Sequence, residues 1–242
     1  GSKDMSFERK EVHKNSQKMA MELSRTIGSG KVVDDPDILE GLAGDESHVE
    51  PIIPDFAARA KTHDDVVAVL TAAKKFSVPV TPRAGGTGKA GGAIPVFGGF
   101  VLDVSRMNQL LEINRTNLTA IVEPGLVTGV FQETVEDEGL FYPPDPNSLE
   151  NCCLGGNVAH NAGGPRAFKY GVTRDYVCGL QAVLPSGEII NCGGKLVKKV
   201  TGYNLMQLLI GSEGTLAIVT KIILRLIPKP QVQIDLLVPY DD

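Results

Sequence analysis

Apolar side chains at helical spacing mark the first element of the chain. Residues 3–28 are mostly polar, but Met19, Leu23 and Ile27 lie four positions apart, and Gly28 stands where a helix would end. The pattern predicts a peripheral helix. Residues 29–54 are acidic and rich in turn-forming residues, so we expect them to form a loop.

A second amphipathic helix is predicted to begin after Thr62. Residues 62–65 read Thr-His-Asp-Asp, which is the pattern of a capping box. Two lysines end the segment, where the negative pole of a helix favours cations. The apolar positions of this helix share one face and are Val66, Val69, Leu70 and Ala73.

Short apolar runs between glycines and prolines predict strands. They lie at residues 78–80, 100–104, 120–122 and 216–228, and the last alternates between apolar and mixed positions. We expect a hairpin over 177–192 with Pro-Ser-Gly at its turn, and another strand over 232–238. Two more helices are predicted, one capped by Thr128 and a short buried one over 205–210.

The most unusual stretch is PRAGGTGKAGGAIP at residues 82–95, which holds five glycines between two prolines. Glycine tolerates positive φ and lets the backbone approach a ligand closely. Successive N–H groups that converge on one point form a concavity that suits a pyrophosphate. The stretch therefore predicts a backbone cradle for an anion.

Three kinds of phosphate loop compete for this stretch. Gly86, Gly88 and Gly91 match G-x-G-x-x-G, but the glycines and prolines that follow exclude the helix which that dinucleotide motif opens. A Walker loop does not fit either, because Ala90 follows Lys89 where serine or threonine is required. A strand–loop–strand with loop amides on the phosphates remains, and an ordinary glycine-rich connection is the alternative.

A second glycine-rich region covers residues 154–164. Two glycine pairs flank Asn157 and Asn161, which predicts a short helical turn whose amide side chains suit the edge of a flat heterocycle. His160 lies between apolar residues; a base is one interpretation and a packing residue is the other. Upstream, three prolines stiffen residues 141–146, so this segment costs little to order around a ligand.

Composition narrows the function. The chain has 242 residues with 24 basic and 29 acidic side chains and a net charge of −5, which does not suggest a nucleic-acid or anionic-membrane surface. The four cysteines show no zinc or dithiol spacing, so we expect reduced, packed thiols and no metal site. Neither a signal peptide nor an apolar run of membrane-spanning length occurs, so the prediction is a soluble cytoplasmic protein.

Four motifs in order give the chain a family resemblance: PRAGGTGKAGGAIP, YPPDP, GGNVAHNAGG with RAFKYG, and TGYNLMQLLIGSEGTLAIVT. Residues from about 50 to 230 resemble the PCMH-type FAD-binding domain of the vanillyl-alcohol oxidase superfamily. The resemblance is to its 2-hydroxyacid branch, with glycolate oxidase FAD subunits and D-lactate or D-2-hydroxyglutarate dehydrogenases. It implies an α+β fold of two subdomains, 51–115 and 116–230, with FAD extended between them.

The resemblance also implies the cofactor-binding residues. Loop amides would hold the pyrophosphate, two further groups would surround the flavin and its linker, and a last group would lie near the adenosine. The pyrophosphate group consists of Ala84, Gly85, Gly86, Thr87, Gly88, Gly91 and Gly92. The two groups around the flavin and its linker are Pro144 and Asp145, and Gly155, Gly156, Asn157, Asn161, Ala162 and Gly163. The group near the adenosine consists of Glu213, Gly214 and Ile218.

Two departures from the family pattern matter. Thr87 stands where relatives that attach FAD covalently carry histidine, so the resemblance implies non-covalent FAD. The family's substrate-binding cap domain, which supplies most substrate contacts and any metal, begins roughly where this chain stops, so residues 231–242 would start it and residues 1–50 would precede the FAD domain. His160 and Tyr203 qualify as bases by chemistry only, and the catalytic residues stay unassigned.

The predicted function is that of the FAD domain of a flavin-dependent 2-hydroxyacid dehydrogenase. A hydride would pass from the substrate Cα to flavin N5, and electrons would leave to an electron-transfer flavoprotein, a quinone or an iron–sulfur subunit. One alternative is an FAD-binding or electron-transfer module that is inactive without a partner or cap domain. Another is an enzyme like alkyl-dihydroxyacetone-phosphate synthase.

Overall fold

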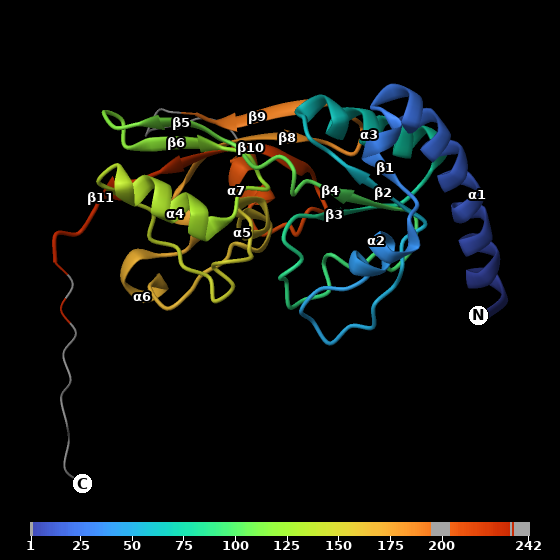
Figure 1. The fold of residues 1–242 in the computed structure, drawn as a ribbon, viewed down its shortest axis with the longest axis horizontal. Helices are drawn as coiled ribbons and strands as arrows, with labels where there is room; N and C mark the ends of the chain where they lie inside the picture. The colour runs from blue at the N-terminus through green and yellow to red at the C-terminus, as the bar shows by residue number, and fades with distance from the viewer. Residues whose placement is uncertain (1, 195–203, 233, 235–242) are drawn as a thin grey trace, which may run out of the picture.

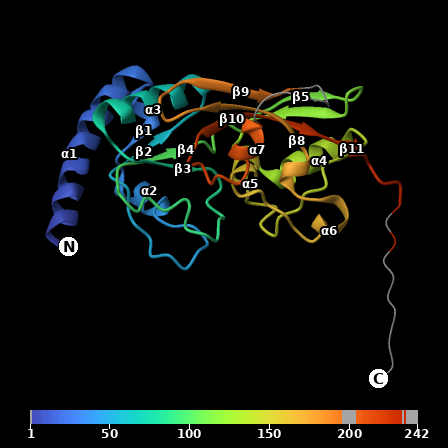
Figure 2. The same ribbon diagram turned by 180° about the vertical axis from the view of Figure 1, so that it is seen from behind.

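The computed structural model describes residues 2–194, 204–232 and 234. Two main sheets lie side by side, each with helices against it, and residues 140–141 and 227–228 pair in a third, two-stranded sheet, so the fold is α+β as expected. Figures 1 and 2 show α3 over the first sheet with α1 outside it, and α4, α5 and α7 along one face of the second. The loops that face the gap between the sheets come from both halves.

The first sheet has the strand order β1-β2-β4-β3. Strands β2, β4 and β3 are parallel, whereas β1 is antiparallel to β2. The bounds of these strands are Val32–Val33 for β1, Phe56–Arg59 for β2, Val80–Arg83 for β3 and Phe100–Asp103 for β4. Strand β3 begins two residues later than predicted and includes Pro82, which an edge strand tolerates.

Helix α3, His63–Phe76, connects β2 to β3 and confirms the predicted capping box. Thr62 Oγ1 accepts a hydrogen bond from Asp65 N at 3.2 Å, and Asp65 Oδ2 accepts one from Thr62 N at 3.0 Å. Helix α1, Ser2–Thr26, packs on α3 through the fully buried side chains of Met19 and Leu23. The two predicted helices therefore form one layer.

The prediction of a loop over residues 29–54 is wrong in part. This stretch forms the turn η1, Ser29–Lys31, the strand β1 and helix α2, Pro36–Gly41. Asp35 caps α2 by accepting hydrogen bonds from the amides of Asp37 and Ile38, and a proline opens the helix. The helix-start signal of Asp35 followed by Pro36 was not recognised, because the whole stretch is acidic.

The second sheet has the order β5-β6-β10-β8-β9 and is antiparallel throughout. Ile218, Thr220, Ile222 and Leu224 of β10 are buried, which confirms the predicted alternation. Strand β5 carries no clear alternation and was not predicted; it lies within residues 51–115 but pairs in the second sheet. The bounds are Leu110–Asn114, Thr119–Val122, Val177–Val183, Ile189–Gly193 and Ile218–Arg225 for β5, β6, β8, β9 and β10.

The remaining elements flank the second sheet. They are α4, Thr128–Asp137; β7, Leu140–Phe141; α5, Leu154–His160; α6, Ala167–Tyr170; η2, Thr173–Asp175; α7, Leu205–Leu209; and β11, Ile227–Pro228. Thr128 does not cap α4 as predicted: Val127 is the N-cap, and Thr128 Oγ1 donates to Cys152 O. Helix α7 is only half-buried, with Leu205 and Leu208 exposed. Most of the strand expected at 232–238 lies outside the described residues.

The two halves share apolar packing and a polar contact. Val183 and Ile218 of the second sheet belong to the core cluster that α3 forms with the first sheet. His63 at the start of α3 is hydrogen-bonded to Thr220 of β10, with 2.9 Å between Nδ1 and Oγ1. These contacts fix the sheets relative to each other at one end of the gap between them.

The connection between β3 and β4 carries no helix. These strands are parallel neighbours, and parallel neighbours are usually joined by a helical crossover. Here residues 84–99 form turns and bends only, which confirms the predicted strand–loop–strand. Asp103 ends β4, and its Oδ1 accepts a hydrogen bond from Ser105 N at 2.9 Å.

Candidate cofactor-binding site

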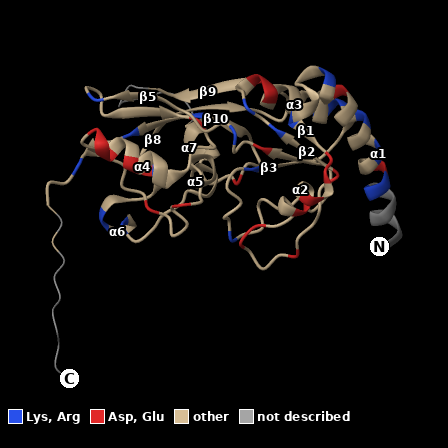
Figure 3. Cartoon of the chain, viewed as in Figure 1, with Lys and Arg blue, Asp and Glu red and all other residues tan. Residues whose placement is uncertain are grey.

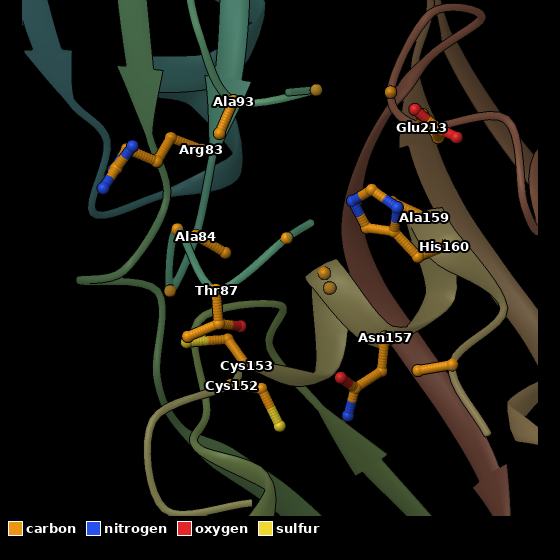
Figure 4. Close-up of a pocket in the computed structure, with 18 of the residues that line it drawn as sticks. Arg83, Ala84, Thr87, Ala93, Cys152, Cys153, Asn157, Ala159, His160 and Glu213 are labelled. Atoms are coloured by element: carbon orange, nitrogen blue, oxygen red, sulfur yellow. The ribbon is translucent and has the colours of Figure 1, made fainter. Parts of the chain in front are cut away.

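A cavity of about 830 Å³ lies between the two halves. Its walls come from the glycine loop after β3, the segment before α5, helix α5 itself and the residues that lead into β10. Figure 4 shows side chains from both sides of this cavity. The volume is at the upper end of the range of roughly 300–1,000 Å³ that is typical of ligand pockets.

The glycine loop depends on conformations and approaches that only glycine allows. Gly86 has a φ of 67° and Gly91 a φ of 80°, both in the left-handed region. A Cβ on Gly85 would lie 2.5 Å from Asn151 O, so the loop backbone contacts the segment before α5 directly. The loop therefore presents main chain, rather than side chains, to this part of the cavity.

Residues 44–47 hold the glycine loop from outside. Arg83 Nη1 donates to Gly44 O at 2.6 Å, and Glu46 N donates to Gly88 O at 2.9 Å. Burial alone would raise the pKa of Asp45, but hydrogen bonds from Ser47 and from the amides of Ala93 and Gly91 outweigh it and lower that pKa. The ionised carboxylate thus stabilises the far end of the loop.

Helix α5 forms the opposite wall, and its two glycines have different surroundings. A Cβ on Gly155 would lie 2.6 Å from Pro124 Cβ, so this glycine permits close packing. A Cβ on Gly156 would meet no atom within 4 Å, and this residue lines the cavity. Gly156 therefore leaves open a space that a ligand can fill.

Most of the residues predicted for cofactor binding lie around this cavity, and the structure brings them together from three distant parts of the chain. Their roles in binding stay predictions. They are Ala84, Gly85, Gly86, Thr87, Gly88, Gly92, Gly155, Gly156, Asn157, Ala162, Gly163, Glu213, Gly214 and Ile218. Asn157 is buried and donates from Nδ2 to Thr128 Oγ1 at 2.6 Å, so its amide group is partly used within the protein.

Four predicted residues do not line the cavity. Gly91 faces outward, since a Cβ there would lie 2.9 Å from Val49 Cγ2. Pro144 is buried and its carbonyl accepts a hydrogen bond from Gln132 at 2.7 Å. Asp145 accepts from the amide of Arg166 at 3.1 Å, and Asn161 Oδ1 accepts from Arg174 N at 2.9 Å.

These four contacts are structural. The carboxylate of Asp145 also lies 3.3 Å from Arg166 Nε, which ties the proline-rich segment to α6. Asn161 adopts a φ of 49° as the C-cap of α5, a position where asparagine is tolerated. The family motifs contain these residues, but motif membership does not distinguish a ligand contact from a brace behind the contact.

Several cavity residues were not predicted as binding residues. Cys152 and Cys153 are buried against the glycine loop, and burial raises the pKa of Cys153 to about 11, so its thiol stays protonated at neutral pH. All four cysteines are thiols outside any disulfide, as expected. Others are Arg83, Lys89, Ala93, Pro146, Asn147, Ser148, Asn151, Ala159 and Ser212.

Of the two interpretations of His160, the packing residue is wrong, because the side chain is exposed. The residue ends α5, it is exposed, and it lines the cavity beside Glu213 (Figure 4). The sequence signal for an exposed position was that His160 ends the short helix whose first turn contains Gly155 and Gly156. The other candidate base, Tyr203, lies outside the described residues.

A metal-binding cluster or a membrane-spanning helix would indicate another function. No group of three histidine, cysteine, aspartate or glutamate side chains in the described part of the chain is placed to hold a metal ion. Within the same residues, every helix is too short or too polar to span a bilayer. Figure 3 shows basic and acidic side chains interspersed over both halves.

Comparisons with known proteins agree with this geometry. The family model described as FAD binding domain matches residues 54–193. The glycolate oxidase subunit GlcD of Bacillus subtilis (strain 168) is 49% identical over 190 residues, which is 78% of this chain and 40% of that protein. A D-lactate dehydrogenase of Anaerostipes hadrus is 40% identical over 211 residues, 83% of this chain and 44% of that protein.

Solved structures show the same fold. A p-cresol methylhydroxylase with bound substrate superposes with a TM-score of 0.79 at 23% identity, covering 90% of this chain and 44% of that one. The chain therefore spans less than half the length of the relatives and of the structural neighbour that it matches.

Proposed function

Because the chain belongs to the family of FAD-binding domains, we propose that it holds FAD non-covalently within an oxidoreductase that acts on small 2-hydroxy acids. The single observation that supports the site best is the helix-free glycine loop between β3 and β4, which forms one wall of a cavity lined on the other side by α5.

The residues present fit an extended dinucleotide. Main-chain amides of the loop 84–88 would bind the diphosphate, because a concavity of N–H groups suits an anion. Gly156 would lie against the cofactor, since a Cβ there would enter empty space. Asn157 and the segment 162–163 would contact the flavin half, and Glu213, Gly214 and Ile218 the adenosine half.

The attachment is proposed to be non-covalent. Thr87 has no nitrogen nucleophile, and the thiol of Cys153 stays protonated at neutral pH, because burial raises its pKa to about 11. Thr87 and Cys153 both line the cavity. For the reasons just given, however, neither side chain is expected to form a bond to the flavin.

The substrate class follows from the relatives. The names of two of them specify glycolate and D-lactate, both 2-hydroxy acids. When bound, FAD supplies a hydride acceptor at N5 for the Cα hydrogen of such a substrate. The contribution of the described residues is to bind and orient the cofactor and to exclude water from its diphosphate. Electrons would pass to a separate acceptor, namely an electron-transfer flavoprotein, a quinone or an iron–sulfur subunit.

Two measurements test the proposal. Titration of flavin fluorescence should show saturable binding of FAD, with riboflavin, which lacks the diphosphate, binding far more weakly. Reduction of an artificial dye by glycolate, D-lactate and D-2-hydroxyglutarate then tests the substrate class in the protein that carries this domain. Equal binding of FAD and riboflavin would remove the assigned role of the glycine loop, and dye reduction by none of the three acids would reject the substrate class.

A further inference from the structure

His160 lines the cavity, and the proposed function gives it no role. In the described part of the chain, neither of its ring nitrogens takes part in a hydrogen bond or ion pair. Its side chain is exposed and extends from α5 toward the glycine loop, with Glu213 beside it (Figure 4). A histidine held in this way is available to a ligand.

The imidazole lies close to two glycines of the opposite half. A Cβ on Gly88 would lie 3.3 Å from His160 Nε2, and a Cβ on Gly92 would lie 3.6 Å from His160 Cε1. The first distance is tighter than most Cβ contacts and the second is an ordinary van der Waals contact, so the imidazole lies against both glycines, and glycine at position 88 leaves room for the ring. His160 thus reaches across the cavity to the loop that is proposed to bind the diphosphate.

The other charged groups near this point are mostly acidic. The carboxylate of Glu213 lies 3.4 Å from the same Cβ position on Gly92, and that of Asp45 lies 3.7 Å from the one on Gly88. The backbone of Glu213 adopts a φ of 55°, and its N–H donates a hydrogen bond to Ala159 O, which fixes the position of the residue. Glu46 and Lys89 also line this part of the cavity.

This charge distribution creates a conflict for an anionic ligand. A diphosphate on the loop would lie near Glu213 and Asp45, and like charges repel each other. A protonated imidazole among these groups would reduce the repulsion and donate a charge-assisted hydrogen bond to a phosphate oxygen. Lys89 adds a positive charge, and Arg83 also lines the cavity and interacts electrostatically with Asp45, so these two cations balance two of the three carboxylates of Asp45, Glu46 and Glu213.

We propose that His160, in its protonated form, clamps the diphosphate of FAD against the glycine loop and makes the affinity for FAD depend on pH. The inference rests on the proposed function, because it assumes that FAD occupies the cavity. Among the described side chains that face this point, only His160 belongs to a type that ordinarily titrates between pH 5 and 8; carboxylates, lysine and arginine ordinarily titrate outside this range.

The test measures the dissociation constant of FAD at pH 5.5, 7.0 and 8.5 by fluorescence. We expect the wild-type constant to rise about tenfold from pH 5.5 to 8.5, the size of a solvent-exposed charge-assisted hydrogen bond. His160→Gln should bind about tenfold more weakly at pH 5.5 and show a flat profile. His160→Lys carries a fixed charge and should stay close to the wild-type constant of pH 5.5 at every pH.

A matched control is His13→Gln, which changes an exposed histidine that lies on α1 and pairs with Asp55, outside the cavity lining. It should keep the wild-type profile. A wild-type slope that persists in His160→Gln, or a flat wild-type profile, would overturn the inference while leaving FAD binding intact. ADP, which carries the same diphosphate, should compete with FAD in the wild type at pH 5.5, and its inhibition constant should be about tenfold higher in His160→Gln. Wild-type protein that binds no FAD at any pH would instead reject the proposed function.

Discussion

Replacing Gly156 with alanine separates cofactor contact from folding. In the FAD-free protein, the added methyl group meets no atom within 4 Å, and the residue lies within α5. Substitution of glycine by alanine at a compatible position stabilises a protein by about 0.4–1 kcal/mol, because the unfolded chain loses freedom. For a chain of this length that corresponds to a rise in Tm of roughly 1–4 °C.

Binding of FAD should change in the opposite direction. If the cofactor lies against Gly156, the methyl group overfills the interface, and overpacking costs about 1–3 kcal/mol. The dissociation constant should therefore rise by roughly 5- to 150-fold. The assay combines thermal unfolding of FAD-free protein with fluorescence titration of FAD.

Gly41→Ala is the matched control for this experiment. Gly41 ends α2, has open space at its Cβ position, and does not line the cavity. Its replacement should raise Tm to a similar extent without changing the affinity for FAD. A Gly156→Ala protein that is stable and binds FAD as tightly as the wild type would refute the placement of the cofactor against α5.

Three further predictions concern the glycine loop and its surroundings. Gly86→Val should lose most bound FAD, because a φ of 67° costs a non-glycine residue about 1–2 kcal/mol and the side chain would meet the guanidinium of Arg83; wild-type occupancy in the absorption spectrum would contradict this. Acid precipitation should release all flavin into the supernatant, since Thr87 cannot form a histidyl bond; yellow colour in the pellet would show a covalent link. Asp45 has a pKa below its ordinary value of 3.8 in the folded state, so it stabilises the protein above that pH and loses this effect as the pH falls through the lower, folded value. Asp45→Asn should therefore show a shallower loss of stability in urea unfolding between pH 5 and 3, and an unchanged slope would exclude this role.

The sequence predicted the elements whose local signals agree with their packing. Helix α3 was found from its capping box and apolar face, and β10 from its alternation. Strand β5 escaped because its side chains are only partly buried, so alternation is weak. Thr128 looked like a cap, but its hydroxyl group bonds to Cys152 and Asn157 instead, a long-range contact that no local pattern reveals.

The candidate site was predictable in outline. Glycine-rich motifs indicated both walls of the cavity, because a backbone that approaches a ligand or another segment closely requires glycine. The same motifs could not show that Asp145 contacts Arg166 while Gly156 faces open space. The sequence left His160 open between a base and a packing residue because Val158 and Ala159 before it are apolar, whereas its neighbours in space are the loop glycines and Glu213.

The hydrogen bonds from residues 44–47 to the glycine loop have a practical consequence. The family match starts at residue 54, so a fragment cut at that limit keeps the whole motif and discards the support behind it. It would also leave β2 without its neighbour β1 and uncover the buried side chain of Ala57. Anyone who trims the protein for crystallisation or transplants the loop into another scaffold should carry the preceding acidic residues along.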